Sequence, residues 1–319
     1  MPRNLHDLPR LRDSVSYLYV EHAVVQRRQH AIEYIREDEG RVLIPVAALN
    51  VLLLGPGTRI THAAVRILAE HGCSVLWVGE DVTRFYAQGV GETRHAYRLL
   101  KQAELASDPQ KRLWVVRRMY EARFGEPLDP DWTLEQIRGR EGNRVRSAYR
   151  AAAKQYGVQW QGRHYDFGSW KRTDPINRAL SAANALLNGL CHAAILAGGY
   201  SPALGFIHTG KQLSFVYDIA DLYKTEITIP AAFEVVAEST EKVESRVRQR
   251  CRERFKEVKL LQRILPDIDR LLGLKTAPPH FELDYDANAA LPAPWWEPEG
   301  GAISEESKNG GDDSGERSA

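Results

Sequence analysis

The first ninety residues consist of short apolar runs separated by Gly, Asp or Pro. Several of these runs alternate apolar and polar residues, which is the pattern of half-buried antiparallel strands. The runs are residues 14–20, 23–28, 31–37, 41–46, 50–54, 74–79 and 84–89. The pattern therefore predicts an antiparallel β-rich domain over residues 1–90.

One helix interrupts these strands at residues 61–70, where Thr61 caps the run AAVRILAE. The surrounding stretch, LLLGPGTRITHAAVRILAEHGCSVLWVGE, resembles a dinucleotide-binding unit, and Glu80 lies at the distance expected for a ribose contact. However, Ile60 replaces the third glycine of that motif, and the flanking segments resemble hairpins more than a βαβ unit. We therefore favour a structural turn, and a dinucleotide-linked enzyme is the weakest alternative.

Beyond Gly91 the apolar positions follow helical spacing. Asp108 and Pro109 begin one predicted helix, and Gly125 ends it. The predicted apolar face of this helix consists of Leu113, Val116, Tyr120 and Phe124.

Three further helical segments follow along the chain. Thr133 and Gln136 form a capping-box pattern in front of the first. Residues 178–197 are small and apolar, which predicts a buried helix. Residues 245–272 are amphipathic, and Pro266 predicts a break or kink within them.

These patterns together predict an α+β protein in three parts. An antiparallel β-rich domain with one helix occupies residues 1–90, and a larger all-α catalytic domain occupies residues 91–275. In residues 276–319 proline accumulates first, followed by Gly, Ser and acidic residues. This composition is typical of disorder, so we expect a mostly disordered C-terminal tail.

Composition limits the class of protein. Hydrophobic residues make up 43% of the 319 residues, and no run approaches the roughly 18 uninterrupted apolar residues of a membrane helix. The N-terminus lacks the apolar region of a signal peptide. Cys73, Cys191 and Cys251 have the spacing of neither a zinc site nor a disulfide framework. We therefore expect a cytoplasmic protein with no membrane association.

Basic residues are concentrated in particular segments, although the formal net charge is only +1. Residues 138–172 hold nine Arg or Lys and two acidic residues, interleaved with aromatic side chains. Basic side chains neutralise phosphates, and aromatic faces stack on unpaired bases. We favour nucleic-acid binding here, with Arg138 and Arg146 as candidate contacts, over a solvated helix followed by a packed aromatic loop.

A second basic stretch, residues 241–263, holds nine Arg or Lys but also four Glu. A solvated helix face is the better interpretation here. Contact of Arg248 with a DNA backbone is the alternative.

Glu141 is unusual within the first basic segment because it lies on the apolar stripe of its predicted helix. A carboxylate that points inward needs a partner, since burying an unpaired charge is very costly. That partner is either a metal ion or Arg138, one helical turn earlier, in a purely structural ion pair.

The string GFIHTGKQLSFVYDIADLYK carries a second group of metal-binding side-chain types. Asp218 and Asp221 are three residues apart, so on a helix both carboxylates project from one side. With His208 they form a donor set that suits Mg²⁺ or Mn²⁺, and Lys211 adds a charge for phosphate. The alternative is a capping Asp, a surface Asp and a core His.

Three strings, GFIHTGKQLSFVYDIADLYK, REGNRVRSAY and LLLGPGTRITHAAVRIL, resemble the integrase subunit of the CRISPR adaptation complex. The resemblance extends over residues 15–279. The resemblance is closest to the E-type branch (type I-E). It implies a β domain followed by an α-helical catalytic domain. It also implies a homodimer, two of which flank a dimer of a small ferredoxin-like subunit in a heterohexamer on double-stranded DNA.

The resemblance also implies roles for individual residues. Glu141, His208 and Asp221 would bind the metal, with Asp218 as a helper or further ligand. The residues implied to hold DNA or assist the site are Arg59, Arg66, Arg84, Lys211 and Tyr165. His22 stands where the family has a tyrosine that wedges against the duplex end, so less area is available for stacking there.

The function implied is CRISPR spacer acquisition. Short DNA fragments would be integrated into the repeat array by metal-dependent 3′-hydroxyl transesterification, with an associated endonuclease activity. Two alternatives are a stand-alone structure-specific DNA nuclease, which would cleave without joining, and a non-catalytic DNA-binding scaffold, which would tolerate loss of Glu141.

Overall fold

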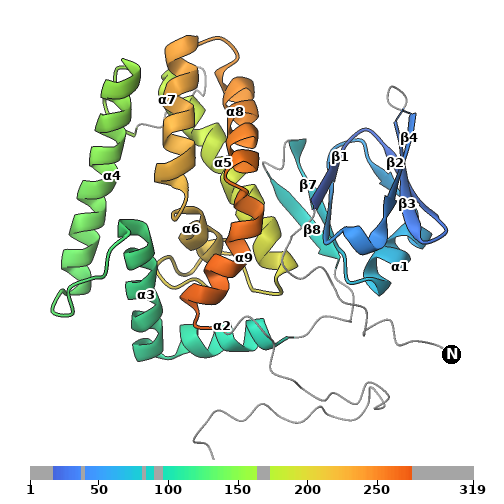
Figure 1. The fold of residues 1–319 in the computed structure, drawn as a ribbon, viewed down its shortest axis with the longest axis horizontal. Coiled ribbons are helices and arrows are strands. Elements are labelled where there is room, and N and C mark those ends of the chain that lie inside the picture. Colours follow the sequence, from blue (N-terminus) through green and yellow to red (C-terminus); the bar gives the residue numbers. More distant parts are fainter. Residues whose placement is uncertain (1–16, 37–39, 81–83, 90–95, 164–172, 275–319) are drawn as a thin grey trace, which may run out of the picture. The chain divides into compact units, whose positions relative to one another are not determined.

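The computed structural model of the protein describes residues 17–36, 40–80, 84–89, 96–163 and 173–274 (Figure 1). Its N-terminal part contains two four-stranded sheets. The first has the order β1 (Tyr17–Val20), β5 (Val51–Leu54), β7 (Ser74–Val78) and β8 (Phe85–Gly89). The second has the order β4 (Gly40–Pro45), β3 (Ala31–Arg36), β2 (Val24–Arg28) and β6 (Arg59–Ile60), and a short 3-10 helix, η2 (Val46–Ala48), follows β4. The prediction of a β-rich N-terminal domain with one helix is confirmed.

The prediction that these strands pair in antiparallel fashion is wrong for most of the first sheet. β1 pairs in parallel with β5, and β5 pairs in parallel with β7; only β8 joins antiparallel. The reason lies in burial: all four residues of β5 are buried, and a continuous apolar run is typical of a parallel strand covered on both faces. In the second sheet β2, β3 and β4 are antiparallel, whereas β6 pairs in parallel with β2.

The one α-helix among the described residues of this part, α1 (His62–Glu70), begins where the sequence predicted. The Thr61 hydroxyl accepts a hydrogen bond from the Ala64 amide at 3.3 Å. The helix connects β5, through β6, to the parallel strand β7. The segment is therefore a βαβ unit, which corrects the interpretation that its flanks are hairpins; Gly57, at φ +70°, turns the chain between β5 and β6.

The helical part begins with α2 (Tyr97–Ser107), and strands give way to helices between Gly89 and Tyr97. The division into domains at residue 90 stays a prediction, and the predicted tail at 276–319 lies outside the described residues. The remaining helices are α3 (Pro109–Phe124), α4 (Leu134–Tyr156), α5 (Pro175–Ala197), α6 (Ser214–Ala220), the π-helical segment η5 (Lys224–Thr228), α7 (Ile229–Glu238), α8 (Val243–Glu257) and α9 (Leu260–Leu271).

Helix α5 forms the centre of this part, and α6, α7, α8 and α9 pack around it (Figure 1). It is long and apolar enough to cross a membrane, but 72% of its most apolar window is buried within the protein. This burial is what a core helix shows. Its last turns also contact the first sheet, where Ala193 and Leu196 pack with residues of β5 and β7.

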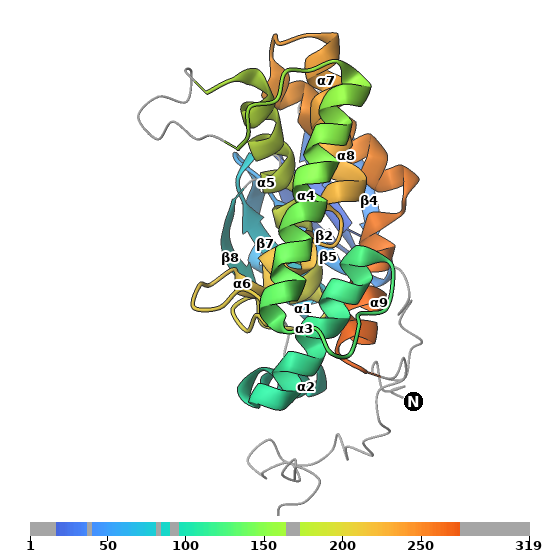
Figure 2. The same cartoon turned by 90° about the vertical axis from the view of Figure 1, so that its left-hand side faces the viewer.

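Helices α3 and α4 are outer helices, and α4 packs on α7 and α3 (Figures 1 and 2). The predicted ends of α3 are confirmed: Asp108 caps its start, and Gly125 ends it in the left-handed conformation. The predicted capping box of Thr133 and Gln136 at the start of α4 is confirmed as well.

The buried face of α3 differs from the predicted one. Leu113 is exposed. The buried positions are Val115, Val116, Met119, Tyr120 and Arg123. The stripe is thus rotated from the predicted face, and it includes a charged residue.

The predicted break near Pro266 is in the wrong place. The chain interrupts the helix at Val258 and Lys259, and Lys259 adopts a left-handed φ of 49°. Pro266 lies inside α9. Restarting the helix at Leu260 turns the apolar residues of α9 inward, and among them Leu260, Ile264 and Ile268 are fully buried.

Candidate active site

Asp218 organises the loop that carries His208. The Asp218 side chain is 0% exposed, and its carboxylate accepts hydrogen bonds from the backbone amides of Phe206 (2.6 Å), Ile207 (3.0 Å) and His208 (2.9 Å). The same carboxylate lies 2.7 Å from His208 Nδ1. Because a carboxylate accepts, Nδ1 carries the proton in this contact, which leaves Nε2 as the ring nitrogen that could bind a metal.

The loop around Asp218 is too tight for any residue but glycine at position 205. A Cβ atom there would lie 2.2 Å from the His208 carbonyl oxygen. The loop therefore holds His208 at a defined place beside α6, and the His208 side chain remains 44% exposed.

Glu141 and Asp221 converge on one buried guanidinium. Glu141 lies on α4, and Asp221 is the C-cap of α6. Arg123 of α3 places Nη1 at 3.6 Å from Glu141 Oε1 and Nη2 at 3.4 Å from Asp221 Oδ2. Helices α3, α4 and α6 thus place two of the predicted metal-binding carboxylates against the same guanidinium.

Two more cations neutralise these carboxylates. Arg144 contacts both oxygens of Glu141, at 2.7 and 3.1 Å. The Lys224 ammonium lies 2.5 Å from Asp221 Oδ1. Arg144 and Arg123, rather than the predicted Arg138, are therefore the ion-pair partners of Glu141.

The donor set fits a divalent metal by its chemistry. Within the described parts of the chain, no three His, Cys, Asp or Glu side chains lie close enough together to hold a metal ion in their present positions. Two carboxylates and one imidazole nitrogen are nevertheless donors that Mg²⁺ and Mn²⁺ accept. Three cations, Arg123, Arg144 and Lys224, already neutralise these two carboxylates, so a bound metal ion would have to replace some of them.

Cys191 lies within electrostatic range of Asp221 and Lys224. Burial raises the pKa of the Cys191 thiol, so the group stays neutral. A neutral thiol is a poor metal ligand. The three cysteines are buried thiols that form no disulfide.

A π-helical segment, η5, begins three residues after Asp221 and contains Lys224 and Thr225. Such segments are rare and are frequently found at functional sites. The Thr225 hydroxyl accepts a hydrogen bond from Arg144 at 3.2 Å. This contact links η5 to the Glu141 side of the cluster.

The predicted DNA contacts lie in several parts of the fold. His22 and Arg59 are neighbours: the His22 amide donates to Pro56 O at 2.9 Å, and the Arg59 amide donates to Ala23 O at 2.9 Å. Arg66 of α1 pairs with Glu70 at 2.6 Å. The others are exposed Arg84, Arg138, Arg146 and Lys211, half-buried Arg248, and Tyr165, which lies outside the described residues.

Sequence analysis missed Arg123, Arg144 and Lys224. Arg123 does carry a signal: it follows Met119 by four residues and Tyr120 by three, within the stripe that α3 buries. A lone Arg on an apolar stripe indicates a buried charge with a partner. Arg144 and Lys224 are each three residues after an acid, a spacing too common to indicate a site.

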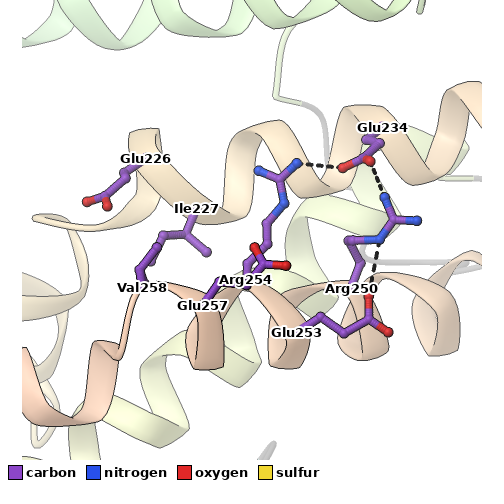
Figure 3. Close-up of a pocket in the computed structure, with 8 residues that line it drawn as sticks. All are labelled: Glu226, Ile227, Glu234, Arg250, Glu253, Arg254, Glu257 and Val258. Atoms are coloured by element: carbon purple, nitrogen blue, oxygen red, sulfur yellow. Dashed lines mark hydrogen bonds and ion pairs between the residues drawn. The ribbon is translucent and has the colours of Figure 1, made fainter.

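A separate pocket of about 460 Å³ lies between η5, α7 and α8 (Figure 3). Its side chains are mostly charged and largely paired with one another. Glu234 pairs with Arg250 and with Arg254, and Arg250 also pairs with Glu253. None of the predicted site residues lines it.

The fold and these contacts define a class of protein: an α+β chain whose helical part holds an Asp–His pair and two carboxylates that share one buried arginine. The family model described as CRISPR associated protein Cas1 matches residues 16–128 and 126–252. The chain therefore belongs to the Cas1 family, the CRISPR-associated endonucleases and integrases of spacer acquisition.

Individual relatives agree with this assignment. CRISPR-associated endonuclease Cas1 2 of Thermus thermophilus is 55% identical over 320 residues, covering 98% of this chain and 96% of the relative. CRISPR-associated endonuclease Cas1 of Escherichia coli is 43% identical over 290 residues, covering 91% and 95%. A crystal structure of the TtCas1–DNA complex has a TM-score of 0.74 and 58% identity, covering 83% of this chain and 99% of that chain.

Proposed function

We propose that this protein joins short DNA fragments to the CRISPR repeat by metal-dependent transesterification, using Glu141, His208 and Asp221 as metal ligands. The observation that carries the proposal is the convergence of α3, α4 and α6. Glu141 and Asp221 share Arg123, and Asp218 fixes His208 through Nδ1. A carboxylate that holds the ring of a metal-binding histidine is a common arrangement around metal ions.

The reaction exchanges one phosphodiester for another. The 3′-hydroxyl oxygen of the fragment forms a bond to a repeat phosphorus and loses its proton, while the bond to the leaving 3′-oxygen breaks and that oxygen gains a proton. A bound Mg²⁺ or Mn²⁺ would polarise the phosphoryl oxygens and favour the deprotonated hydroxyl. Asp218 keeps His208 oriented, and exposed Lys211 is a candidate for a phosphate contact. No nucleoside triphosphate is needed.

The partners follow from the same proposal. DNA as a partner is supported by the TtCas1–DNA complex, which is a relative's structure; that this DNA is double-stranded rests on the sequence motifs. The E-type branch, the homodimer and the heterohexamer with a small ferredoxin-like subunit rest on the sequence motifs. We place the protein in the cytoplasm, in keeping with its three free cysteines.

A strand-joining assay tests the proposed function. Labelled short duplex and supercoiled repeat-bearing plasmid would be incubated with the full chain and the partner subunit, with Mn²⁺ or with a chelator. We expect joined product with Mn²⁺ and none with the chelator. Cleavage without joining would favour the stand-alone nuclease, and DNA binding with neither reaction would favour the scaffold.

Arg59 offers a test of the DNA contacts. It is exposed on β6, and we expect Arg59→Gln to weaken duplex binding and to reduce the slope of log affinity against log salt by about one. The measurement is fluorescence anisotropy at several salt concentrations. Arg270→Gln is the matched control, since Arg270 is exposed, is already paired with Asp267 and lies outside both basic segments; an unchanged slope for Arg59→Gln would remove it from the DNA contacts.

A further inference from the structure

We propose that Arg123 is a positioning residue of the metal site: it holds the carboxylates of Glu141 and Asp221 where a divalent ion binds. The inference rests on the proposed function, because it concerns the same site. It adds a residue that touches neither the metal nor the DNA and acts through the two carboxylates.

The contacts of Arg123 connect every element that carries the site except the His208 loop. Its guanidinium pairs with Glu141 of α4 and with Asp221 at the end of α6. Its Nη2 also donates to the backbone carbonyl of Asp218 at 3.2 Å. The planar guanidinium presents several donors in fixed directions, so one group can serve three acceptors at once.

Burial distinguishes Arg123 from the other two cations. The Arg123 side chain is 3% exposed, whereas Arg144 and Lys224 are 26% and 27% exposed. Arg144 and Lys224 also make the shorter contacts, at 2.7 and 2.5 Å. A metal ion that needs these oxygens can displace the two partly exposed cations, which then turn to solvent. The buried Arg123 side chain has almost no access to solvent, so it stays paired with the carboxylates.

The Arg123 guanidinium also packs against an aromatic ring of its own helix, α3. The guanidinium carbon lies 5.4 Å from the Tyr120 ring centroid, and Tyr120 is buried. A cation over an aromatic face is stabilised there. The guanidinium is therefore fixed before the metal arrives, as a positioning group must be.

The test measures metal binding rather than activity. Mn²⁺ alone is titrated into the full chain and followed by electron paramagnetic resonance, for wild type and Arg123→Lys. Lysine keeps the charge but lacks the planar set of donors, so we expect Mn²⁺ to bind about tenfold more weakly, the usual effect of losing a group that orients metal ligands. Equal affinity in the two proteins would overturn the inference.

Control variants separate the positioning role of Arg123 from effects of local charge and from general effects on folding. Arg117→Lys changes the same helix at a residue that donates to two backbone carbonyls of the α3–α4 connection, and its Mn²⁺ affinity should equal that of wild type. Arg144→Gln and Lys224→Gln should bind Mn²⁺ at least as tightly as wild type, because they remove cations that the metal displaces. Weaker binding in either would contradict the distinction between exchangeable and fixed cations.

A second variant covers the case in which Arg123→Lys does not fold. Arg123→Gln removes a charge that repels the metal, so charge alone predicts tighter binding, whereas the positioning role predicts weaker binding. Failure of both variants to fold would make Arg123 a structural residue and would overturn the inference. If wild type binds no Mn²⁺, the proposed function fails. If wild type binds Mn²⁺ and Arg123→Lys binds it equally tightly, the inference fails and the proposed function still stands.

Discussion

Replacing His208 with alanine is expected to reduce strand joining by about 1,000-fold, equivalent to about 4 kcal/mol of lost transition-state stabilisation. The change removes the imidazole nitrogen of the donor set. The fold should survive, since the His208 side chain is nearly half exposed and Asp218 keeps its three backbone hydrogen bonds. The measurement is the yield of joined product at saturating Mn²⁺.

His30→Ala is the matched control because His30 is an exposed histidine in the β2–β3 turn. Its joining rate should equal that of wild type. Binding of the duplex should be unchanged in both variants. If His208→Ala joined DNA at the wild-type rate, the site would have to be assigned to other residues.

Replacing Asp218 with alanine is expected to lower the free energy of unfolding by about 4 kcal/mol. The change leaves three backbone amides without their acceptor, one of them on fully buried Phe206, and unsatisfied buried donors are costly. Equilibrium urea unfolding, followed by circular dichroism, measures the effect. Asp131→Ala, at an exposed position, should change the value by less than about 0.5 kcal/mol.

Asp218→Asn separates the effect of this side chain on the free energy of unfolding from its effect on the orientation of the His208 ring. The amide keeps one acceptor oxygen, so it should cost less stability than alanine, but it places a donor next to the backbone amides or the ring. A loss of stability close to zero in Asp218→Ala would mean that the loop does not depend on this carboxylate. Its part in holding His208 would then have to be abandoned.

Local features of the fold were predictable because they depend on neighbouring residues. Thr61, Asp108, Gly125 and the capping box of Thr133 mark helix ends through contacts within one turn. The same holds for the buried helix α5, whose composition alone indicates a core position. Local hydrogen bonds and local hydrophobicity decide these elements.

Long-range features were not predictable in the same way. The parallel pairing of β1 with β5 and of β5 with β7 depends on which strands meet in space, and short apolar runs do not encode it. The place of the helix interruption at Lys259, instead of Pro266, depends on which face of α9 must be buried.

The candidate site shows the same limit. The residue types at Glu141, His208 and Asp221 were recognisable from motifs, and their ligand roles stay a proposal. Arg123 was missed because its partners lie 18 and 98 residues further along the chain, on two other elements. Only the folded structure, in which the Arg123 side chain reaches α4 and the end of α6, reveals that one guanidinium serves both carboxylates.

The position of α5 has a consequence for how the protein unfolds. Most of its length belongs to the helical core, and Ala193 and Leu196 near its end pack with residues of β5 and β7. Melting of α5 would therefore remove apolar cover from the first sheet as well. The cooperativity of unfolding should extend across the strand–helix junction, so that both parts lose structure in a single transition.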